Sequence, residues 1–209
     1  MVEFEDFELA YMPVPKAGST AVKTALTALG GERPDEGDTA WVHNHMPTRR
    51  FSPEGFARSA PFWRFTVIRD PIERLLAVYS DLILGRDVMA YSADVRRGRV
   101  HLPTRPDPDF FFQNLDRYRA ASFAIKHHAM KQMVFTGPDL GAYDHIYDAA
   151  RLDEVFADLS SMTGRQVAAS VAAPQETIKM RDLKPETRAI IRAEAAADYD
   201  AFSGFLVAA

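Results

Sequence analysis

The sequence predicts a single α/β domain with a mostly parallel central sheet flanked by helices. Short apolar runs alternate with segments whose apolar residues recur at helical spacing, and this alternation is typical of such folds. The 209 residues are enough for one sizeable core, and 47% of them are apolar while 26% are charged, as in ordinary globular proteins. We therefore expect residues 1–209 to form one domain.

The overall composition excludes several classes of protein. The net charge of −4 gives no general attraction to nucleic acid or to an anionic membrane. The absence of cysteine excludes disulfides and thiolate zinc sites. No apolar run is long enough to span a bilayer, and the acidic N-terminus lacks the order of a signal peptide. We expect a cytoplasmic protein, and the sequence leaves its oligomeric state open.

In the first half of the chain, three apolar runs predict strands. The predicted strands cover about residues 7–14, the run TAWVHNH at 39–45, and FWRFTVI at 62–68. A helix is predicted from Ser19 to the Gly30-Gly31 pair, and a short one over 52–60 with Ser52 as N-cap. Each predicted helix follows or precedes a strand, as the α/β assignment requires.

The second half is predicted to be mainly helical. Asp70 is a good N-cap for a helix that runs to Gly85, and residues 86–108 look like a polar, basic excursion over the surface. DHIYDA is the remaining strand candidate. Further helices are predicted over 110–118, 122–135, 151–164 and about 185–208.

The stretch VPKAGST, residues 14–20, lies in a strand-to-helix turn. The first N–H groups of a helix lack helical partners and the helix dipole adds partial positive charge, so an anion is the natural ligand there. Gly18 allows close approach of backbone, Ser19 and Thr20 carry hydroxyls, and Lys16 adds a full charge. The order differs from the nucleotide-triphosphate loop, in which lysine follows the last glycine. The alternative is an ordinary helix start with a solvated lysine.

Arg69 follows the strand at 62–68 directly, within FTVIRDPIERL. Its planar guanidinium can hold a phosphate or carboxylate with two parallel hydrogen bonds. Alternatively, it pairs with Asp70 or Glu73 at the helix start. Since ligands of α/β folds bind at the carboxyl ends of strands, both turns are expected to open on the same edge of the sheet.

His43 and His45 alternate on the predicted strand 39–45, so both side chains are expected on one face. Three interpretations remain: packed strand histidines, two metal ligands, or a general base. A zinc site needs more ligands, and no cysteine exists. A neutral imidazole suits proton abstraction near neutral pH.

Together, PKxGST near the N-terminus and RDPxERLL about 50 residues later resemble the PAPS-dependent sulfotransferases. The likeness is to the carbohydrate type, sulfotransferase family 2, and within it to the uronyl and heparan 2-O-sulfotransferases. The resemblance implies a donor, 3′-phosphoadenosine 5′-phosphosulfate (PAPS), a hydroxyl acceptor, and no metal. It implies a P-loop-like sulfotransferase core. Because the chain is short beside the animal members of the family and lacks their membrane anchor and cysteines, we expect a bacterial, cytoplasmic protein.

The resemblance also assigns roles to the cofactor motifs. The first loop would hold the 5′-phosphosulfate through Lys16, Ala17, Gly18, Ser19 and Thr20, with Lys16 at the bridging oxygen of the leaving group. Arg69 would hold the 3′-phosphate. The family usually has a serine eight residues after this arginine, but this chain has Ala77. Ser80, Lys179 and Arg181 are therefore further candidates for binding the nucleotide.

In the 2-O-sulfotransferases a His-x-His pair lies about two dozen residues before the arginine, and here His45 precedes Arg69 by 24 residues. The resemblance therefore places the pair at the catalytic centre. We expect His43 to be the base, with His45 assisting it or orienting the substrate. The acceptor hydroxyl would attack sulfur in line, without a covalent enzyme intermediate.

The acceptor is expected to be a glycan or a small molecule, held by basic side chains. The related enzymes carry a basic excursion after the RDPIERL helix, where this chain has RRGRVHLPTR. Alternatively, this stretch is a solvated surface loop, and His128 and Gln132 pack or cap helices. The substrate-side candidates are Arg49, Arg96, Arg97, Arg99, His128 and Gln132.

Two other functions compete with sulfuryl transfer. A P-loop kinase-like phosphotransferase needs a lysine after the last glycine and an acidic magnesium ligand, and Lys16 is on the wrong side of Gly18. A nucleotide-binding domain that has lost its activity is supported only by Ala77.

Overall fold

The computed structural model of this chain describes residues 1–32, 35, 38–167 and 177–205. Its contacts divide the chain into two compact units. The first unit is Met1–Arg69 with Gln132–Pro174, and the second is Asp70–Lys131 with Gln175–Ala209. The predicted α/β architecture with a mostly parallel sheet is confirmed. That residues 1–209 act as one domain stays a prediction.

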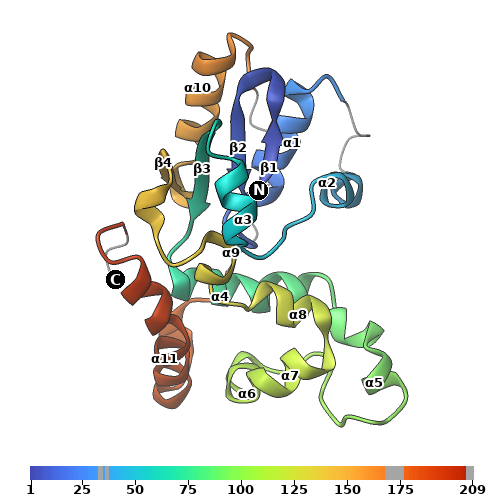
Figure 1. Cartoon of the computed structure of the whole chain (residues 1–209). Helices are drawn as coiled ribbons and strands as arrows, with labels where there is room; N and C mark the ends of the chain where they lie inside the picture. The colour runs from blue at the N-terminus through green and yellow to red at the C-terminus, as the bar shows by residue number, and fades with distance from the viewer. Residues whose placement is uncertain (33–34, 36–37, 168–176, 206–209) are drawn as a thin grey trace. The chain divides into compact units, whose positions relative to one another are not determined.

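The first unit contains a four-stranded sheet in the order β1-β2-β3-β4 (Figure 1). β1 is antiparallel to β2, while β2, β3 and β4 are parallel neighbours. The strands predicted at 7–14, 62–68 and 144–149 are confirmed, and β1 is an addition at the edge. The bounds are β1 Val2–Phe4, β2 Leu9–Met12, β3 Trp63–Ile68 and β4 His145–Asp148.

One face of this sheet carries the core of the first unit. Alternate strand residues, Leu9 and Tyr11 on β2 and Phe65 and Val67 on β3, join one buried cluster, as the period of two in a strand requires. Helices α1 and α10 supply the other side of that cluster. Their contribution is Val22, Leu26 and Leu29 from α1 with Val155 and Leu159 from α10.

The helices of the first unit begin mostly where the sequence predicts. α1 starts at Ser19, and Ser52 caps α3 by accepting a hydrogen bond from the Gly55 N–H at 3.2 Å. The α-helices are α1 Ser19–Leu29, α2 Thr39–His45, α3 Pro53–Arg58, α9 Met133–Thr136 and α10 Leu152–Thr163, and the 3-10 turns are η1 Glu5–Phe7, η4 Leu140–Ala142 and η5 Ala149–Arg151.

The prediction that TAWVHNH forms a strand is wrong, because Thr39–His45 is helix α2. The Asp38 side chain accepts a hydrogen bond from the Trp41 N–H at 2.9 Å, so it acts as an N-cap. Val42 is the buried residue of this helix. The local cap therefore outweighs the strand-like alternation, and the expectation that His43 and His45 share a face fails with it.

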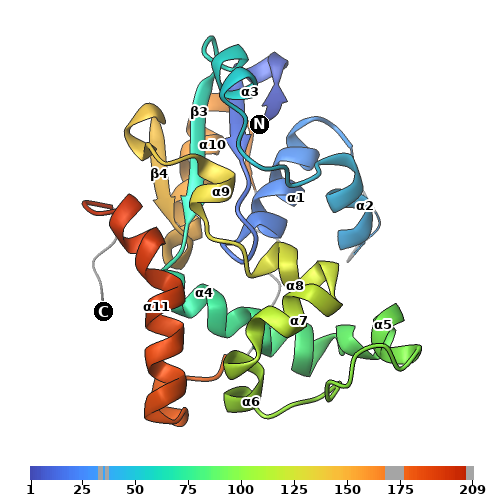
Figure 2. The same ribbon diagram turned by 60° about the horizontal axis from the view of Figure 1, so that its bottom comes forward.

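The second unit is helical (Figure 2). Asp70 caps α4 as predicted, since its carboxylate accepts from the Glu73 N–H at 2.8 Å. The helix continues as a π-helical segment that ends at Gly85. The elements are α4 Pro71–Val78, η2 Tyr79–Gly85, η3 Val88–Tyr91, α5 Ala93–Arg96, α6 Pro108–Gln113, α7 Leu115–Ala121, α8 Phe123–His128, η6 Met180–Asp182 and α11 Pro185–Ala201.

Several boundaries in this half differ from prediction. The helix expected at 110–118 is interrupted at Asn114, and the one at 122–135 divides into α8 and α9. The excursion 86–108 is not wholly superficial, because Met89 and Leu102 are buried in the core of the second unit. The C-terminal helix ends at Ala201, and the last part of its predicted range, 206–209, lies outside the described residues.

Candidate active site

The turn between β2 and α1 contains two residues with left-handed backbone. Lys16 has a φ of 66° and Gly18 a φ of 74°, and this region is uncommon for a residue that has a side chain. The Ala17 N–H donates to the Val14 carbonyl at 3.3 Å and closes the turn. Where left-handed residues alternate with residues of right-handed or turn conformation, successive backbone N–H groups point to the same side. They form a concavity that suits an anion.

Gly18 is required at its position for two reasons. Its φ of 74° strains any L-residue. A Cβ atom added there would lie 2.7 Å from Cδ1 of Leu152, the first residue of α10. The turn therefore packs against the Leu152 side chain of α10, which would have to move to admit a Cβ at position 18.

Arg69 meets this turn, because its Nη1 donates to the Lys16 carbonyl oxygen at 3.4 Å. The two strand-to-helix turns thus open on the same edge of the sheet, as predicted. Gln132 holds the main chain of Arg69 from both sides. The Arg69 N–H donates to Oε1 of Gln132 at 3.0 Å, and Nε2 of Gln132 donates to the Arg69 carbonyl at 2.7 Å.

Gln132 is fully buried. Its contacts make it a positioning residue for Arg69, and its predicted contact with an acceptor stays a prediction.

His43 points from α2 to the first turns of α1. Its Nε2 lies 3.1 Å from Oγ1 of Thr20, and its Nδ1 lies 3.4 Å from Nζ of Lys23. Thr20 belongs to the predicted cradle, so a potential proton acceptor stands beside a potential anion site. His43 is itself exposed to solvent, which leaves it accessible to a substrate.

His45 is directed differently, because residues two apart on a helix lie on nearly opposite sides. Its ring stacks on Trp41 with centroids 3.6 Å apart, and its Nδ1 lies 2.9 Å from the Trp41 carbonyl, to which it donates. The structure thus distinguishes the two histidines: His43 adjoins the cradle and His45 packs along its own helix.

Lys23 is the residue of this site that the sequence reasoning missed. It is fully buried on α1, where its ammonium donates to Oγ1 of Thr48 at 2.7 Å and contacts His43. Removal from water disfavours the charged form, so burial lowers the pKa of Lys23 to about 8. The available signal was a polar stripe at helical spacing, formed by Thr20, Lys23 and Thr27.

The remaining nucleotide candidates lie in the second unit. Ser80 is buried, and its hydroxyl donates to the Leu76 carbonyl at 3.2 Å and accepts from the Ile178 N–H at 3.3 Å. Lys179 and Arg181 are exposed, and Arg181 lies 3.8 Å from Asp182. Their predicted contact with a nucleotide stays a prediction.

The substrate-side candidates are divided between the units. Arg49 in the first unit is exposed, and so are Arg96 and Arg97 in the second. Arg99 is exposed and pairs with Asp94 at 3.4 Å. His128 is half-buried, and its Nδ1 donates to the Ala124 carbonyl at 2.8 Å, as a helix-packing residue does.

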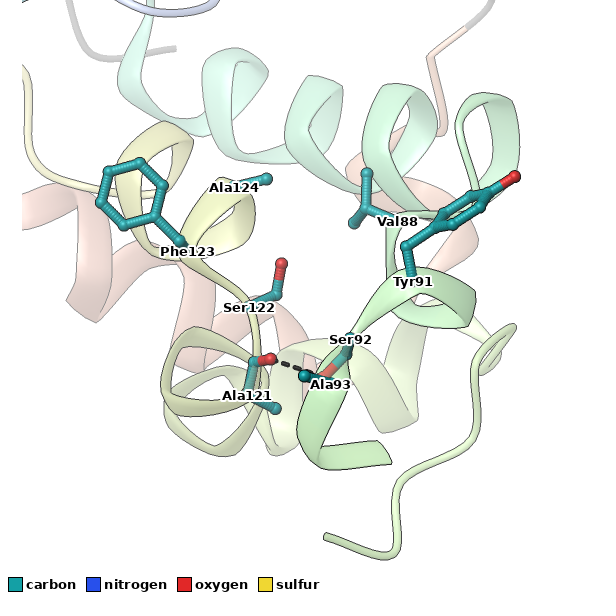
Figure 3. A pocket seen from close by; sticks show the side chains of 8 residues that line it. All are labelled: Val88, Tyr91, Ser92, Ala93, Ala121, Ser122, Phe123 and Ala124. Carbon is teal, nitrogen blue, oxygen red and sulfur yellow. Dashed lines mark hydrogen bonds between the residues drawn. The ribbon is translucent and has the colours of Figure 1, made fainter. Parts of the chain in front are cut away.

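The second unit also carries an open hollow of about 380 Å³ (Figure 3). The exposed rings of Tyr91 and Phe123 lie on opposite sides of it. Ser92 donates to the Ala121 carbonyl at 2.7 Å, and Ser122 accepts from the Ile125 N–H at 3.4 Å. None of the predicted site residues lines this hollow, so it has no assigned role.

Two features are absent from the residues that the structure describes. No helix among them is long and apolar enough to cross a membrane. Within the same residues, no cluster of three or more histidine, cysteine or acidic side chains has the arrangement of a metal site.

The comparison with protein families identifies the class of this protein. The profile described as the sulfotransferase family matches residues 1–201. The chain therefore belongs to the sulfotransferase family, specifically sulfotransferase family 2. No curated protein and no solved structure matches this chain significantly. The family supports sulfuryl transfer to an acceptor hydroxyl as the general reaction.

Proposed function

We propose that this protein transfers a sulfuryl group from PAPS to a hydroxyl group, with a carbohydrate as the acceptor and His43 as the general base. The observation that carries the proposal is the position of His43, with Nε2 at 3.1 Å from Thr20 of the loop that follows β2. A base beside an anion cradle is the arrangement that transfer of a charged group to a hydroxyl requires.

The residues present fit an anionic donor. Lys16 has a left-handed backbone, Gly18 leaves no room for a Cβ against Leu152, and the α1 N-terminus follows at once. Lys16, Ser19, Thr20 and the loop N–H groups would hold the phosphosulfate. Arg69 would bind the 3′-phosphate through its planar guanidinium, because Gln132 fixes its main chain at the end of β3.

When bound, PAPS supplies a sulfuryl group on an activated phosphosulfate oxygen. The role of Lys16 and the loop N–H groups is to neutralise the negative charge that develops on the leaving phosphate. The role of His43 is to accept the proton of the acceptor hydroxyl at Nε2. These two tasks require no metal ion, in agreement with the order of lysine and glycine in the loop.

The acceptor is proposed to be a carbohydrate because the chain resembles the carbohydrate type of the family. Exposed arginines at 49, 96, 97 and 99 are compatible with an acidic glycan. His45 would assist without touching the acceptor, because its ring packs on Trp41.

The two histidines give a matched test. We expect His43→Ala to lower the turnover of labelled PAPS by about 10²- to 10⁴-fold, the usual contribution of a general base. His45→Ala should change turnover less than tenfold. The assay would use a panel of desulfated uronic-acid oligosaccharides, neutral disaccharides and phenols, and would follow sulfuryl transfer by mass spectrometry.

Binding of 3′-phosphoadenosine 5′-phosphate serves as the control for folding in both variants. If His43→Ala retained wild-type turnover, or if His45→Ala lost as much as His43→Ala, then the assignment of His43 as base would be wrong.

A further inference from the structure

Lys23 lies in surroundings that do not favour a permanent ammonium ion. It is fully buried, and no carboxylate among the described residues forms an ion pair with it. Its hydrogen-bond partners are the Thr48 hydroxyl and Nδ1 of His43. A buried charge without a counter-ion is costly, so the neutral amine is unusually accessible here.

The charge state of Lys23 limits which nitrogen of the neutral His43 ring can carry the proton. An ammonium has only donors, so beside it Nδ1 must be an acceptor and the neutral ring carries its proton on Nε2. That Nε2–H then donates to Oγ1 of Thr20. A neutral amine has a lone pair, so Nδ1–H can donate to it, and Nε2 then presents its own lone pair toward Thr20.

We propose that Lys23 is a positioning residue that selects the tautomer of His43, with the ammonium holding the inactive Nε2–H form and the neutral amine holding the base-competent Nδ1–H form. This inference rests on the proposed function of His43. In the base-competent form the O–H bond of the acceptor would break as its oxygen bonds to sulfur, while the bond from sulfur to the bridging oxygen breaks and 3′-phosphoadenosine 5′-phosphate leaves with that electron pair. The proton goes to Nε2, while Nδ1–H stays hydrogen-bonded to Lys23.

The titration that this device requires lies in an accessible pH range. Burial lowers the pKa of Lys23 to about 8. Within the part of the chain that the structure describes, His43 of α2 is the titratable group that contacts the Lys23 ammonium, and Thr48 is a neutral acceptor. On α1 itself, the polar neighbours at helical spacing are the neutral hydroxyls of Thr20 and Thr27, and that of Thr27 donates to the Lys23 carbonyl at 2.8 Å.

The test is a ¹⁵N NMR titration of histidine-labelled protein without donor or acceptor. The resonances of His43 are assigned by their loss in His43→Gln. In the wild type we expect Nε2 to change from a protonated to an unprotonated nitrogen as the pH rises through about 8. In Lys23→Met this change should vanish, while Lys126→Met, which removes an exposed lysine, should leave it unchanged.

A second measurement uses only the wild type, in case Lys23→Met fails to fold. With the lysine ε-carbons labelled, the Lys23 resonance should titrate with a midpoint at about pH 8 and share that midpoint with the His43 change. A single His43 tautomer across pH 6.5 to 10, or different midpoints for the two groups, would overturn the proposal.

Activity provides the link to function. The value of kcat/KM reports groups of the free enzyme, and we expect it to rise with pH through the Lys23 titration in the wild type and in Lys126→Met. The NMR experiment contains no donor, so its failure would refute the tautomer device alone. If the His43 tautomer still changed with the Lys23 titration but the protein bound no 3′-phosphorylated nucleotide, the proposed function would be refuted instead.

Discussion

Gly18 illustrates how a single residue determines the shape of the cradle. Its φ of 74° favours glycine, and Cδ1 of Leu152 lies 2.7 Å from the position that a Cβ would occupy. The two effects are separable, because Gly164 has a similar φ of 65° with nothing within 4 Å of an added Cβ. The first glycine is therefore constrained by backbone and by packing, and the second by backbone alone.

We predict that Gly18→Ala destabilises the protein by about 2–5 kcal/mol, the sum of about 1–2 kcal/mol of left-handed backbone strain and about 1–3 kcal/mol of overpacking. Gly164→Ala should cost only about 1–2 kcal/mol from the strain. Urea unfolding of both variants measures the difference. If both substitutions lowered the free energy of unfolding equally, the contact of Gly18 with Leu152 would not constrain the loop.

At the scale of elements, the end of β3 depends on a residue far along the chain. Gln132 makes one hydrogen bond with the N–H of Arg69 and one with its carbonyl, at 3.0 Å and 2.7 Å. Since Arg69 also donates to the Lys16 carbonyl, this amide orients the side chain that links the two turns.

We predict that Gln132→Met weakens binding of 3′-phosphoadenosine 5′-phosphate by about tenfold, or about 1.4 kcal/mol, although Arg69 is retained. Isothermal titration measures the effect. Gln113→Met is the matched control, because the amide of Gln113 donates to the Thr187 hydroxyl in the second unit at 3.0 Å. Unchanged affinity in a folded Gln132→Met protein would argue against the positioning role.

The secondary structure was predictable where local signals agreed. The buried runs at 7–14 and 62–68, and the caps at Ser52 and Asp70, appear as expected. The prediction failed at Thr39–His45, where apolar and polar residues alternate but Asp38 caps a helix. Over a segment as short as Thr39–His45, the two-residue period of a strand and the 3.6-residue period of a helix are hard to distinguish. The Asp38 cap was the decisive signal.

The candidate site was predictable in its residue types but not in its contacts. Lys16, Arg69 and His43 were each identified from their motifs. The partner of His43 was not, because a lysine within a helix normally reaches solvent. Only the packing of α2 against α1 shows that Lys23 is buried beside His43 and Thr48.

At the scale of the whole molecule, the chain consists of two units with separate hydrophobic cores. The family profile spans residues from both, since it covers residues 1–201. The cradle, Arg69, His43 and Lys23 all belong to the first unit. The net charge of −4 does not oppose the proposed anionic donor, because Lys16 and Arg69, the side chains proposed to hold it, are both positive.

The proposed function requires the first unit to bind a 3′-phosphorylated nucleotide, the product that remains after sulfuryl transfer. The most direct measurement is calorimetric titration with 3′-phosphoadenosine 5′-phosphate against ATP, ADP and AMP, with and without magnesium, for the wild type, Lys16→Ala and Arg69→Ala. We predict tight, magnesium-independent preference for the 3′-phosphorylated nucleotide that Arg69→Ala weakens by at least tenfold. No binding, or a preference for ATP with magnesium, would contradict the account.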